Sequence, residues 1–485
     1  MLTYAIMKKV ILLVVVFCSM MIPGARGQIK RGIEPVRVAE FRIATMIGRL
    51  RAVPVRLMAQ NAILLVYSED GEVDPFEDMF FFPKHTLKLM LVTEQGQQIW
   101  RKELNEGVIP GIWFCPVFPF DLDRDGSEEI WFVNNADPVH PLSIKGYRLT
   151  RLDGETGEQT GEWPWPRPAA AQSTSHRYRN FIWGAYVQDT PVLLTAQGTY
   201  GPMKIQAWNE DMTLRWEYSV PAEPKQPRGS HMNPVVDIDQ DGIDEIMWGE
   251  RCLNSATGKE VFVADRDVYS GHSDIIQPVF NYEESRWYVY TCRESGEPPR
   301  VILFDDQGKR VWSDIARGHM DMGWTARTGK QGQRMAYALR IGGKQAGPAG
   351  FSRTGVEQFT YDAFTGKIQT VPFTLYKSFP VDLNGDGVHE LVREASDNAE
   401  GAILDFQGNS LMKLRMHEQV AMVSRFLPYP GEQILTYSSD GNVTFWRDKN
   451  ANDSKEALAR YQHPFYRKNQ KLTATGYNLL NLGGL

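Results

Sequence analysis

An acidic motif of ten residues recurs three times along the chain and constrains its fold more than any other feature. The copies read DLDRDGSEEI from Asp121, DIDQDGIDEI from Asp237 and DLNGDGVHEL from Asp382. They share the form D-[IL]-[DN]-x-D-G-x-x-E-[IL], and proline with apolar residues precedes each copy. Agreement at so many positions does not arise three times by chance, so the motif marks a repeated structural unit.

A second, weaker repeat consists of a polar turn with glycine, followed by an apolar or aromatic residue. Examples are TEQGQQIW, FDDQGKRVW and LDFQGNSLM, and eight candidate turns of this kind follow one another about every 40 to 60 residues. Between them lie short runs rich in β-branched and aromatic residues, such as PVLLTAQ and RWYVYTC, which are typical of strands. Residues 90–450 show no helical periodicity.

Sets of about four strands that repeat near every 50 residues are the signature of an all-β protein of the β-propeller class. Each unit would be one blade, and the polar turn would be the hairpin that joins its outer strands. Eight turns predict eight blades, or seven if the first and last segments complete one shared blade. We expect one propeller domain over residues 28–485, with a closing tail from about residue 450, because no Pro/Ser-rich linker interrupts it.

Residues 1–27 have the pattern of a secretory signal peptide. Lys8 and Lys9 precede the apolar run VILLVVVFCSMMI, and Ala25 and Gly27 provide a small-x-small cleavage pattern. The apolar run is shorter than the ~20 residues of a membrane span. We therefore expect a secreted or periplasmic protein without a membrane span.

Charge and cysteine content narrow the possible functions. A formal net charge of -6 without a basic block argues against a nucleic-acid partner, so an anionic substrate would need a local cluster of cationic side chains. Cys115, Cys252 and Cys292 remain after the leader, and three cysteines cannot all pair within one chain. Each is expected to be a small buried side chain, with one disulfide or a metal ligand as alternatives. We expect a monomer.

The acidic motif differs from the loop of an EF-hand calcium sensor. An EF-hand places its bidentate glutamate at position twelve between helices, whereas here the glutamate stands at position nine between strand-like runs. Two interpretations remain: a structural Ca²⁺ site, which we favour, or aspartates that cap turns. Asn384 replaces the middle aspartate of the third loop, so we expect weaker binding there. The candidate calcium ligands are Asp121, Asp123, Asp125, Asp237, Asp239, Asp241, Glu245, Asp382, Asn384 and Asp386.

Several stretches resemble known polysaccharide lyases. HMNPVVDIDQDGIDEIMWGE resembles the blade motif of rhamnogalacturonan lyases, and SGHSDIIQPV, YTCRES and RGHMDMGW resemble successive blade starts of propeller lyases. PLSIKGYRLTRLDGETGEQTGEWPWP, SHRYRNFIWGAYV and LLTAQGTYGPMKIQAW are most similar to the ulvan lyases of polysaccharide lyase families twenty-four and twenty-five. The resemblance covers roughly residues 80–450.

The resemblance implies a seven-bladed propeller and a secreted enzyme that cleaves an ulvan-like acidic polysaccharide by β-elimination. A rhamnogalacturonan lyase on the same scaffold is one alternative. A non-catalytic propeller that binds glycan or protein and holds structural calcium is another.

β-Elimination on a uronate needs a base for the C5 proton, an acid for the C4 oxygen and a cation beside the carboxylate. By resemblance, a His–Tyr pair moves the protons and an arginine binds the carboxylate. We assign His140 and Tyr200 as the acid/base pair, with the order of the two roles left open, and His176 as a supporting proton or substrate group. Each also has a non-catalytic interpretation: the histidines as surface residues and the tyrosine as a packing residue at a blade edge. The candidate carboxylate binders are Arg215, Arg177 and Arg179.

A second candidate group is His272, Cys292 and His319, which lie near the starts or middles of neighbouring repeats. Two histidines and one cysteine suit Zn²⁺, which prefers nitrogen and sulfur ligands in a tetrahedral site. We expect such an ion to be structural. Its fourth ligand would be water, Tyr269, His231 or Cys252.

Overall fold

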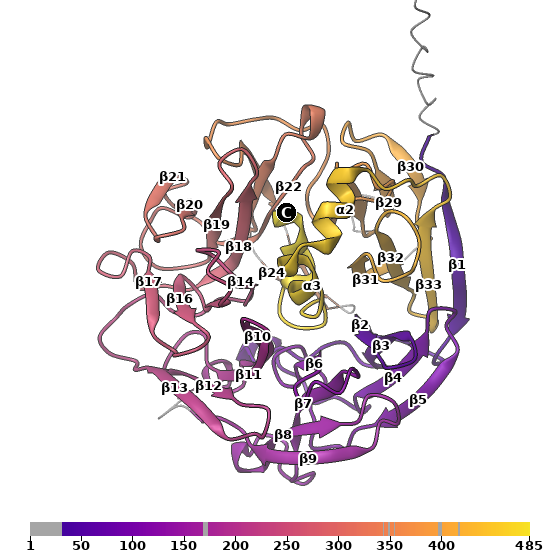
Figure 1. Ribbon diagram of the computed structural model, residues 1–485, viewed down its shortest axis with the longest axis vertical. Helices are drawn as coiled ribbons and strands as arrows, with labels where there is room; N and C mark the ends of the chain where they lie inside the picture. Colours follow the sequence, from indigo (N-terminus) through magenta and orange to yellow (C-terminus); the bar gives the residue numbers. More distant parts are fainter. Residues whose placement is uncertain are drawn as a thin grey trace, which may run out of the picture. The chain divides into compact units, whose positions relative to one another are not determined.

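Antiparallel strands build eight sheets that stand as blades around a central axis (Figure 1). The computed structural model describes residues 32–167, 173–342, 344–347, 350–353, 355–395, 400–415 and 418–485. Residues 33–485 form one compact unit, and the expected signal peptide lies outside the described residues. Among the described residues, every helix is too short or too polar to cross a membrane.

In every blade but the last, the strands follow one another in sequence from the axis outwards (Figure 1). The first four such blades comprise β2 (Arg49–Arg56), β3 (Asn61–Ser68), β4 (Lys88–Thr93) and β5 (Gln98–Glu103); β6 (Val117–Phe120), β7 (Glu129–Asn135), β8 (Tyr147–Leu152) and β9 (Gln159–Pro164); β10 (Asn180–Val187), β11 (Thr190–Gln197), β12 (Met203–Trp208) and β13 (Leu214–Val220); and β14 (Val235–Val236), β15 (Glu245–Met247), β16 (Arg251–Asn254) and β17 (Glu260–Val263).

Three further blades continue the ring, and short helices occur in the connections. The blades comprise β18 (Ser273–Asn281), β19 (Arg286–Arg293), β20 (Val301–Asp305) and β21 (Arg310–Asp314); β22 (Met320–Ala326), β23 (Met335–Arg340) and β26 (Glu357–Asp362), with the hairpin β24 (Lys344–Gly347) and β25 (Gly350–Arg353) inserted; and β27 (Ser378–Val381), β28 (Glu390–Arg393), β29 (Ala402–Leu404) and β30 (Ser410–Lys413). The short helices are η1 (Glu77–Met79), η2 (Ile144–Gly146), α1 (Thr174–Arg177) and η3 (Lys330–Gly332).

The eighth blade joins the two ends of the described chain. β31 (Gln419–Ser424), β32 (Gln433–Tyr437) and β33 (Asn442–Asp448) supply its inner strands, and β1 (Pro35–Arg42) pairs antiparallel with β33 as the outermost strand. The β-propeller fold is confirmed, and the number of blades is eight, the alternative count, instead of the seven that the resemblance implied. The first and last segments do complete one shared blade. The other seven blades are each built from strands in sequence order, so the shared blade is the eighth.

An aromatic residue on an outer strand packs against the glycine turn of the next blade. Trp216 of β13 donates its Nε1–H to the carbonyl oxygen of Ser255 at 2.8 Å, and its ring lies 2.6 Å from where a Cβ on Gly258 would stand. Gly258 has a φ of +69°, which glycine adopts without strain. The turn-and-aromatic repeat of the sequence thus links neighbouring blades. The same arrangement joins Trp100 to Gly157 and Trp312 to Gly366.

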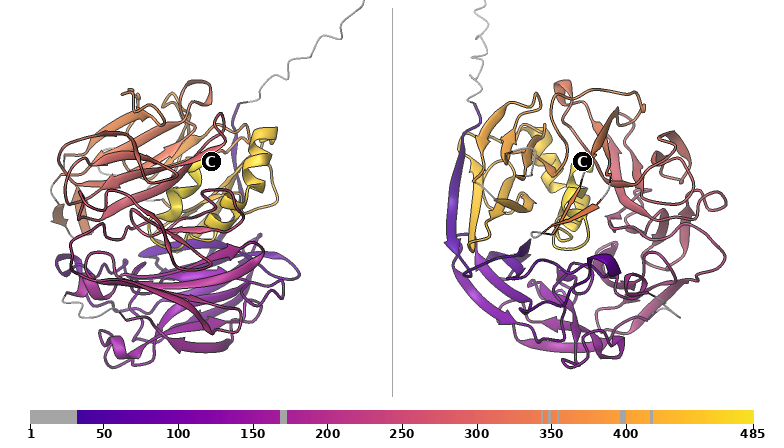
Figure 2. Two further views of the ribbon diagram at one scale, coloured as in Figure 1. Left: turned by 60° about the vertical axis from the view of Figure 1, so that its left-hand side comes forward. Right: turned by 180° about the vertical axis from the view of Figure 1, so that it is seen from behind.

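The tail beyond β33 fills the centre of the ring (Figures 1 and 2). Asn469 donates from Nδ2 to the carbonyl oxygen of Val235 on β14 at 2.7 Å, and Gln277 of β18 donates to the carbonyl oxygen of Leu480 at 3.0 Å. The innermost strands of several blades therefore converge on this segment. Its helices are α2 (Lys455–Gln462), α3 (Pro464–Gln470) and η4 (Asn478–Gly484).

Candidate active site

A pocket of about 520 Å³ opens on one face of the propeller, close to its axis. Its walls come from the segments that precede innermost strands and from the loops between second and third strands of blades. In an antiparallel sheet, these two kinds of connection lie at the same end. The blade geometry therefore brings side chains from distant parts of the sequence to one place.

Three neighbouring blades each contribute a histidine. His231, His272 and His319 precede β14, β18 and β22, respectively. In His272-Ser273-Asp274 and His319-Met320-Asp321, a β-bulge falls at the aspartate. Each histidine is accompanied by that carboxylate, with nitrogen–oxygen distances of 3.7 Å and 2.6 Å. Both pairs line the pocket.

Four of these groups converge on one point that suits a cation. His231, His272, Asp274 and Glu294 each offer a ligand atom, and all four atoms lie within 4.8 Å of one another. Asp274 Oδ1 lies 3.3 Å from His231 Nε2 and 3.7 Å from His272 Nε2. Asp274 Oδ1 is buried without a hydrogen bond among the described residues, and Glu294 Oε2 lies in contact with His272 Nε2. Two carboxylates and two imidazoles with unsatisfied buried atoms fit a divalent metal ion.

The titration of the cluster agrees with this interpretation. Burial lowers the pKa of His272 to about 4 and also lowers the pKa of His231, so both imidazoles are neutral near pH 7, as metal ligands must be. Burial and the charge of Glu294 raise the pKa of Asp274 well above its ordinary value. A carboxyl in this position would ionise more readily beside a bound cation.

Glu294 also belongs to a second group. It contacts His319 Nε2, whose Nδ1 lies 2.6 Å from Asp321 Oδ1. Burial lowers the pKa of His319, but hydrogen bonds to Asp321 and Glu294 raise it to about 9 overall. The cluster therefore places one cationic imidazole beside the four candidate metal ligands.

Tyr200 and Arg179 form the adjoining wall. The Tyr200 hydroxyl lies 3.0 Å from His231 Nε2, and burial raises the pKa of Tyr200 well above its ordinary value. The Arg179 guanidinium stands 5.4 Å from the centre of the Tyr200 ring and is held by Asp74, with Nη2–Oδ1 at 2.8 Å. His176, at the end of α1, lies with its ring centre 6.0 Å from that of Tyr200. Burial lowers the pKa of His176, so this imidazole is neutral near pH 7.

The structure brings together His176, Arg179 and Tyr200 of the sequence-predicted residues, but places others elsewhere. His140 is 69% exposed, is bonded to Asp137 and lines a separate cleft. Arg215 lies on β13, the outermost strand of its blade, where its Nε donates to the carbonyl oxygen of Ala256 at 3.1 Å. The structure therefore places His140 and Arg215 outside this pocket, and their roles as acid or base and as carboxylate binder stay predictions. Arg177 ends α1 and does not line the pocket.

The expected zinc ligands also separate. His272 and His319 both contact Glu294, but the sulfur of Cys292 packs between two blades, 3.5 Å from the Tyr290 hydroxyl. Of the fourth ligands considered, His231 joins the cluster, and Cys252 lies in a hydrophobic core. The Tyr269 hydroxyl donates to the carbonyl oxygen of His272 at 2.7 Å. Carboxylates therefore stand beside the histidines where we expected the sulfur of Cys292. The spacing His-x-Asp was the signal that could have revealed two of them, and Glu294 had none.

The acidic loops lie on the opposite face, because they join the first and second strands of their blades. In the first loop, oxygens of Asp121, Asp123 and Asp125 lie within 4.8 Å of one another. The same is true of Asp237, Asp239 and Glu245 in the second loop, where Asp241 instead accepts the Ile243 N–H at 2.7 Å. Burial and the charges of Asp239 and Asp241 raise the pKa of Glu245 to about 8. Calcium at these loops stays a prediction.

The third acidic loop is covered by the tail. Asp382 accepts a hydrogen bond of 2.9 Å from the Tyr461 hydroxyl, and its Oδ2 lies 4.0 Å from Nη1 of Arg460. Asn384 Oδ1 accepts the Asp386 N–H at 2.8 Å. In this loop, protein groups already supply positive charge and hydrogen-bond donors to the first aspartate.

No family model matches the chain. Two curated proteins of Bacillus subtilis (strain 168) are similar to it in sequence. Rhamnogalacturonan exolyase YesX is 26% identical over 352 residues, which cover 63% of this chain and 53% of that protein. Rhamnogalacturonan endolyase YesW is 24% identical over 264 residues, covering 46% and 42%. The chain thus spans about half the length of the curated relatives that it matches.

Solved structures of similar proteins support the same fold. The crystal structure of exotype rhamnogalacturonan lyase YesX superposes with a TM-score of 0.74 at 17% identity, covering 92% of this chain and 82% of that one. The rhamnogalacturonan lyase PL11 of Bacillus licheniformis gives 0.70 at 16% identity, covering 90% and 80%. At such low identity, these likenesses show the β-propeller fold alone.

Proposed function

We propose that the protein is a polysaccharide lyase that cleaves a uronate-containing polymer by β-elimination, with rhamnogalacturonan as its substrate. The observation that carries this proposal is the pocket near the axis, where a candidate cation site adjoins Tyr200, His176 and Arg179. The sequence likeness to two rhamnogalacturonan lyases supports this polymer over ulvan.

The pocket residues have the properties that the reaction needs. His176 is neutral near pH 7, so its imidazole accepts the C5 proton. The C4–O bond then breaks as the C4=C5 double bond forms, and Tyr200, whose phenol retains its proton, protonates the leaving oxygen. Arg179, fixed by Asp74, stabilises the negative charge that develops on Tyr200.

The negative uronate carboxylate opposes removal of the C5 proton, so positive charge must face it. His231, His272, Asp274 and Glu294 would hold a divalent cation, which when bound supplies that charge. These four side chains come from consecutive blades and are largely buried, so their positions are set by the fold.

Incubation with rhamnogalacturonan tests the proposal, because β-elimination leaves an unsaturated uronate that absorbs ultraviolet light. We expect Tyr200→Phe to lower kcat by about 100-fold or more. Tyr282→Phe, on an exposed loop of another blade, is the matched control and should retain the wild-type rate. If rhamnogalacturonan yields no unsaturated product at any divalent-cation concentration, the proposed substrate is wrong.

Ulvan is the second candidate substrate. The stretches that resemble ulvan lyases contain His176, Arg179 and Tyr200, which are the three groups that the structure brings together. The same ultraviolet assay on ulvan, run beside rhamnogalacturonan, decides between the two polymers. We further propose that the protein is exported as a monomer and that calcium occupies the first two acidic loops, as the sequence predicts.

A further inference from the structure

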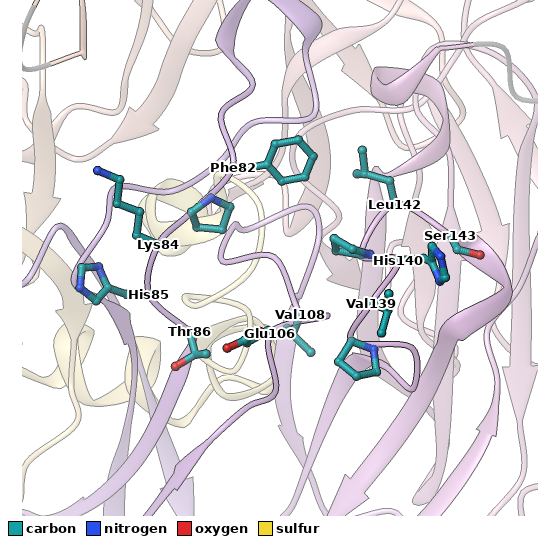
Figure 3. A pocket seen from close by; sticks show the side chains of 13 residues that line it. Phe82, Lys84, His85, Thr86, Glu106, Val108, Val139, His140, Leu142 and Ser143 are labelled. Atoms are coloured by element: carbon teal, nitrogen blue, oxygen red, sulfur yellow. The ribbon is translucent and has the colours of Figure 1, made fainter.

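A second cleft, of about 800 Å³, lies on the same face as the candidate active site. Figure 3 shows its two walls: Phe82, Lys84 and His85 on one side, and Val139 and His140 on the other. The first wall belongs to the loop between β3 and β4, and the second to the loop between β7 and β8. Glu106, from a connection between blades, lies between the walls (Figure 3).

Each wall presents a histidine that an aspartate orients. His85 Nδ1 lies 3.3 Å from Asp70 Oδ2, and His140 Nδ1 lies 2.8 Å from Asp137 Oδ2. The aspartates also fix the loops: Asp70 accepts the backbone N–H of His85 at 2.7 Å, and Asp137 accepts that of His140 at 3.1 Å. With Nδ1 engaged, Nε2 of each ring remains for a ligand. Both imidazoles are therefore held in place without a partner for that nitrogen among the described residues.

The cleft also exposes apolar surface that is held rigidly. Phe82 is 63% exposed and Val139 is 76% exposed. Phe80 packs against Phe82 at 89° with ring centres 5.0 Å apart, and Phe80 itself leans on the buried ring of Phe114. An exposed aromatic ring that packs against a neighbouring ring is suited to binding, because its side chain loses little conformational entropy when a ligand covers the exposed face.

The loop between β3 and β4 lines both the cleft and the active-site pocket, and hydrogen bonds tie both walls of the cleft to α1 and the residue after it. The loop that carries Phe82 also carries Glu77, whose carboxylate accepts the Thr174 N–H of α1 at 2.8 Å. Beyond α1, the Tyr178 hydroxyl donates to the carbonyl oxygen of Leu142 in the opposite wall of the cleft. His176 of the pocket lies between these two anchors in the sequence. The cleft and the pocket thus lie on the same face and share the loop between β3 and β4.

We propose that this cleft is a distal saccharide subsite, which binds sugar units of the polymer beyond the bond that is cleaved. Phe82 packs against the apolar face of one ring, Lys84 and the Nε2 edges of His85 and His140 bind uronate carboxylates and hydroxyls, and Glu106 accepts hydroxyl protons. The assignment of a uronate polymer rests on the proposed function. The subsite explains why two ordered histidines and an exposed phenylalanine share one cleft.

Substrate length tests the subsite. We expect the double variant Phe82→Ala/His140→Ala to raise KM for polymeric rhamnogalacturonan about 10-fold, which corresponds to about 1.4 kcal/mol of binding. KM for the shortest oligosaccharide that is still cleaved should change less than 2-fold, because that substrate does not reach the cleft. Phe406→Ala, which removes another exposed phenylalanine from an outer turn, is the control. Equal effects on both substrates, or no effect on either, would overturn the subsite.

Direct binding separates the subsite from the catalytic proposal. In a Tyr200→Phe background, polymeric rhamnogalacturonan should bind measurably by calorimetry or affinity electrophoresis, and the double variant should weaken that binding about 10-fold. Weakened binding without any lyase product from the wild type would refute the catalytic proposal and retain the subsite. Product formation with unweakened polymer binding would refute the subsite and retain the catalytic proposal.

Discussion

At the scale of single residues, Asp274 is the most informative position of the pocket. Its carboxylate is nearly fully buried and faces two imidazoles and Glu294, and its Oδ1 makes no hydrogen bond among the described residues. We expect Asp274→Asn to reduce the affinity for the divalent cation about 100-fold and to lower kcat in parallel. Elemental analysis of the purified variant measures the first effect. Retention of a full equivalent of metal would contradict the proposed ligand set.

We expect the protonation state of His176 to determine how activity falls at low pH. Burial lowers its pKa from the ordinary value of 6.5, and the imidazole must be neutral to accept a proton. As the pH falls, kcat/KM should therefore decline only once the pH drops below 6.5, and His176→Gln should remove most of the rate. The profile of kcat/KM against pH checks this. An acid limb with its midpoint above 6.5 would exclude His176 as the base.

Sequence reasoning located only part of the pocket. It singled out His272, His319 and Tyr200, because histidine and tyrosine are conspicuous at the starts and ends of strand-like runs. It missed Asp274 and Glu294, since single carboxylates are common and their role depends on which blades stand side by side. His140 and Arg215 lie away from the pocket, which sequence reasoning did not foresee. The local sequence does not indicate how far a residue lies from the propeller axis.

At the scale of elements, the contact between an outer-strand tryptophan and the next blade's turn can be tested directly. Gly258→Ala would force a side chain into left-handed backbone geometry and against the Trp216 ring. We expect a loss of about 3 kcal/mol in the free energy of unfolding. Gly355→Ala has a similar positive φ but open space around its Cβ, so it should cost only about 1 kcal/mol. Urea unfolding of both variants measures the difference.

The elements themselves were largely predictable from sequence. Turn glycines, strand-like runs and the acidic repeat identified the blades, since each blade reuses the same local interactions. The choice between eight blades and seven was not predictable, because closure by β1 depends on pairing with β33, which is distant in the sequence. The contacts of Asp382 were not predictable either, because Tyr461 and Arg460 reach its loop only when the tail lies inside the ring.

At the scale of the whole molecule, the two kinds of candidate metal site lie on opposite faces and should respond independently. Calcium at 100 times its dissociation constant would stabilise the fold by about 2.7 kcal/mol for each acidic loop that binds it. We expect chelation to lower the thermal midpoint, and Asp237→Asn to reduce the shift while the pocket retains its own cation. Calorimetry with and without calcium tests this. A shift unaltered in Asp237→Asn would show that the second acidic loop acts only as a turn cap.

The pairing of β1 with β33 has a consequence for the time course of folding. β1 is the first strand of the described chain and β33 is the last. We therefore expect the blade that they share to be completed only after the other blades have formed. Contacts of such long sequence separation form slowly, since a long loop must close before they stabilise anything. Until then, β33 presents an unpaired edge that can capture another chain. The yield of folded protein should therefore fall as the protein concentration rises, because aggregation through this edge competes with closure of the last blade. This loss is expected even though the finished propeller is stable.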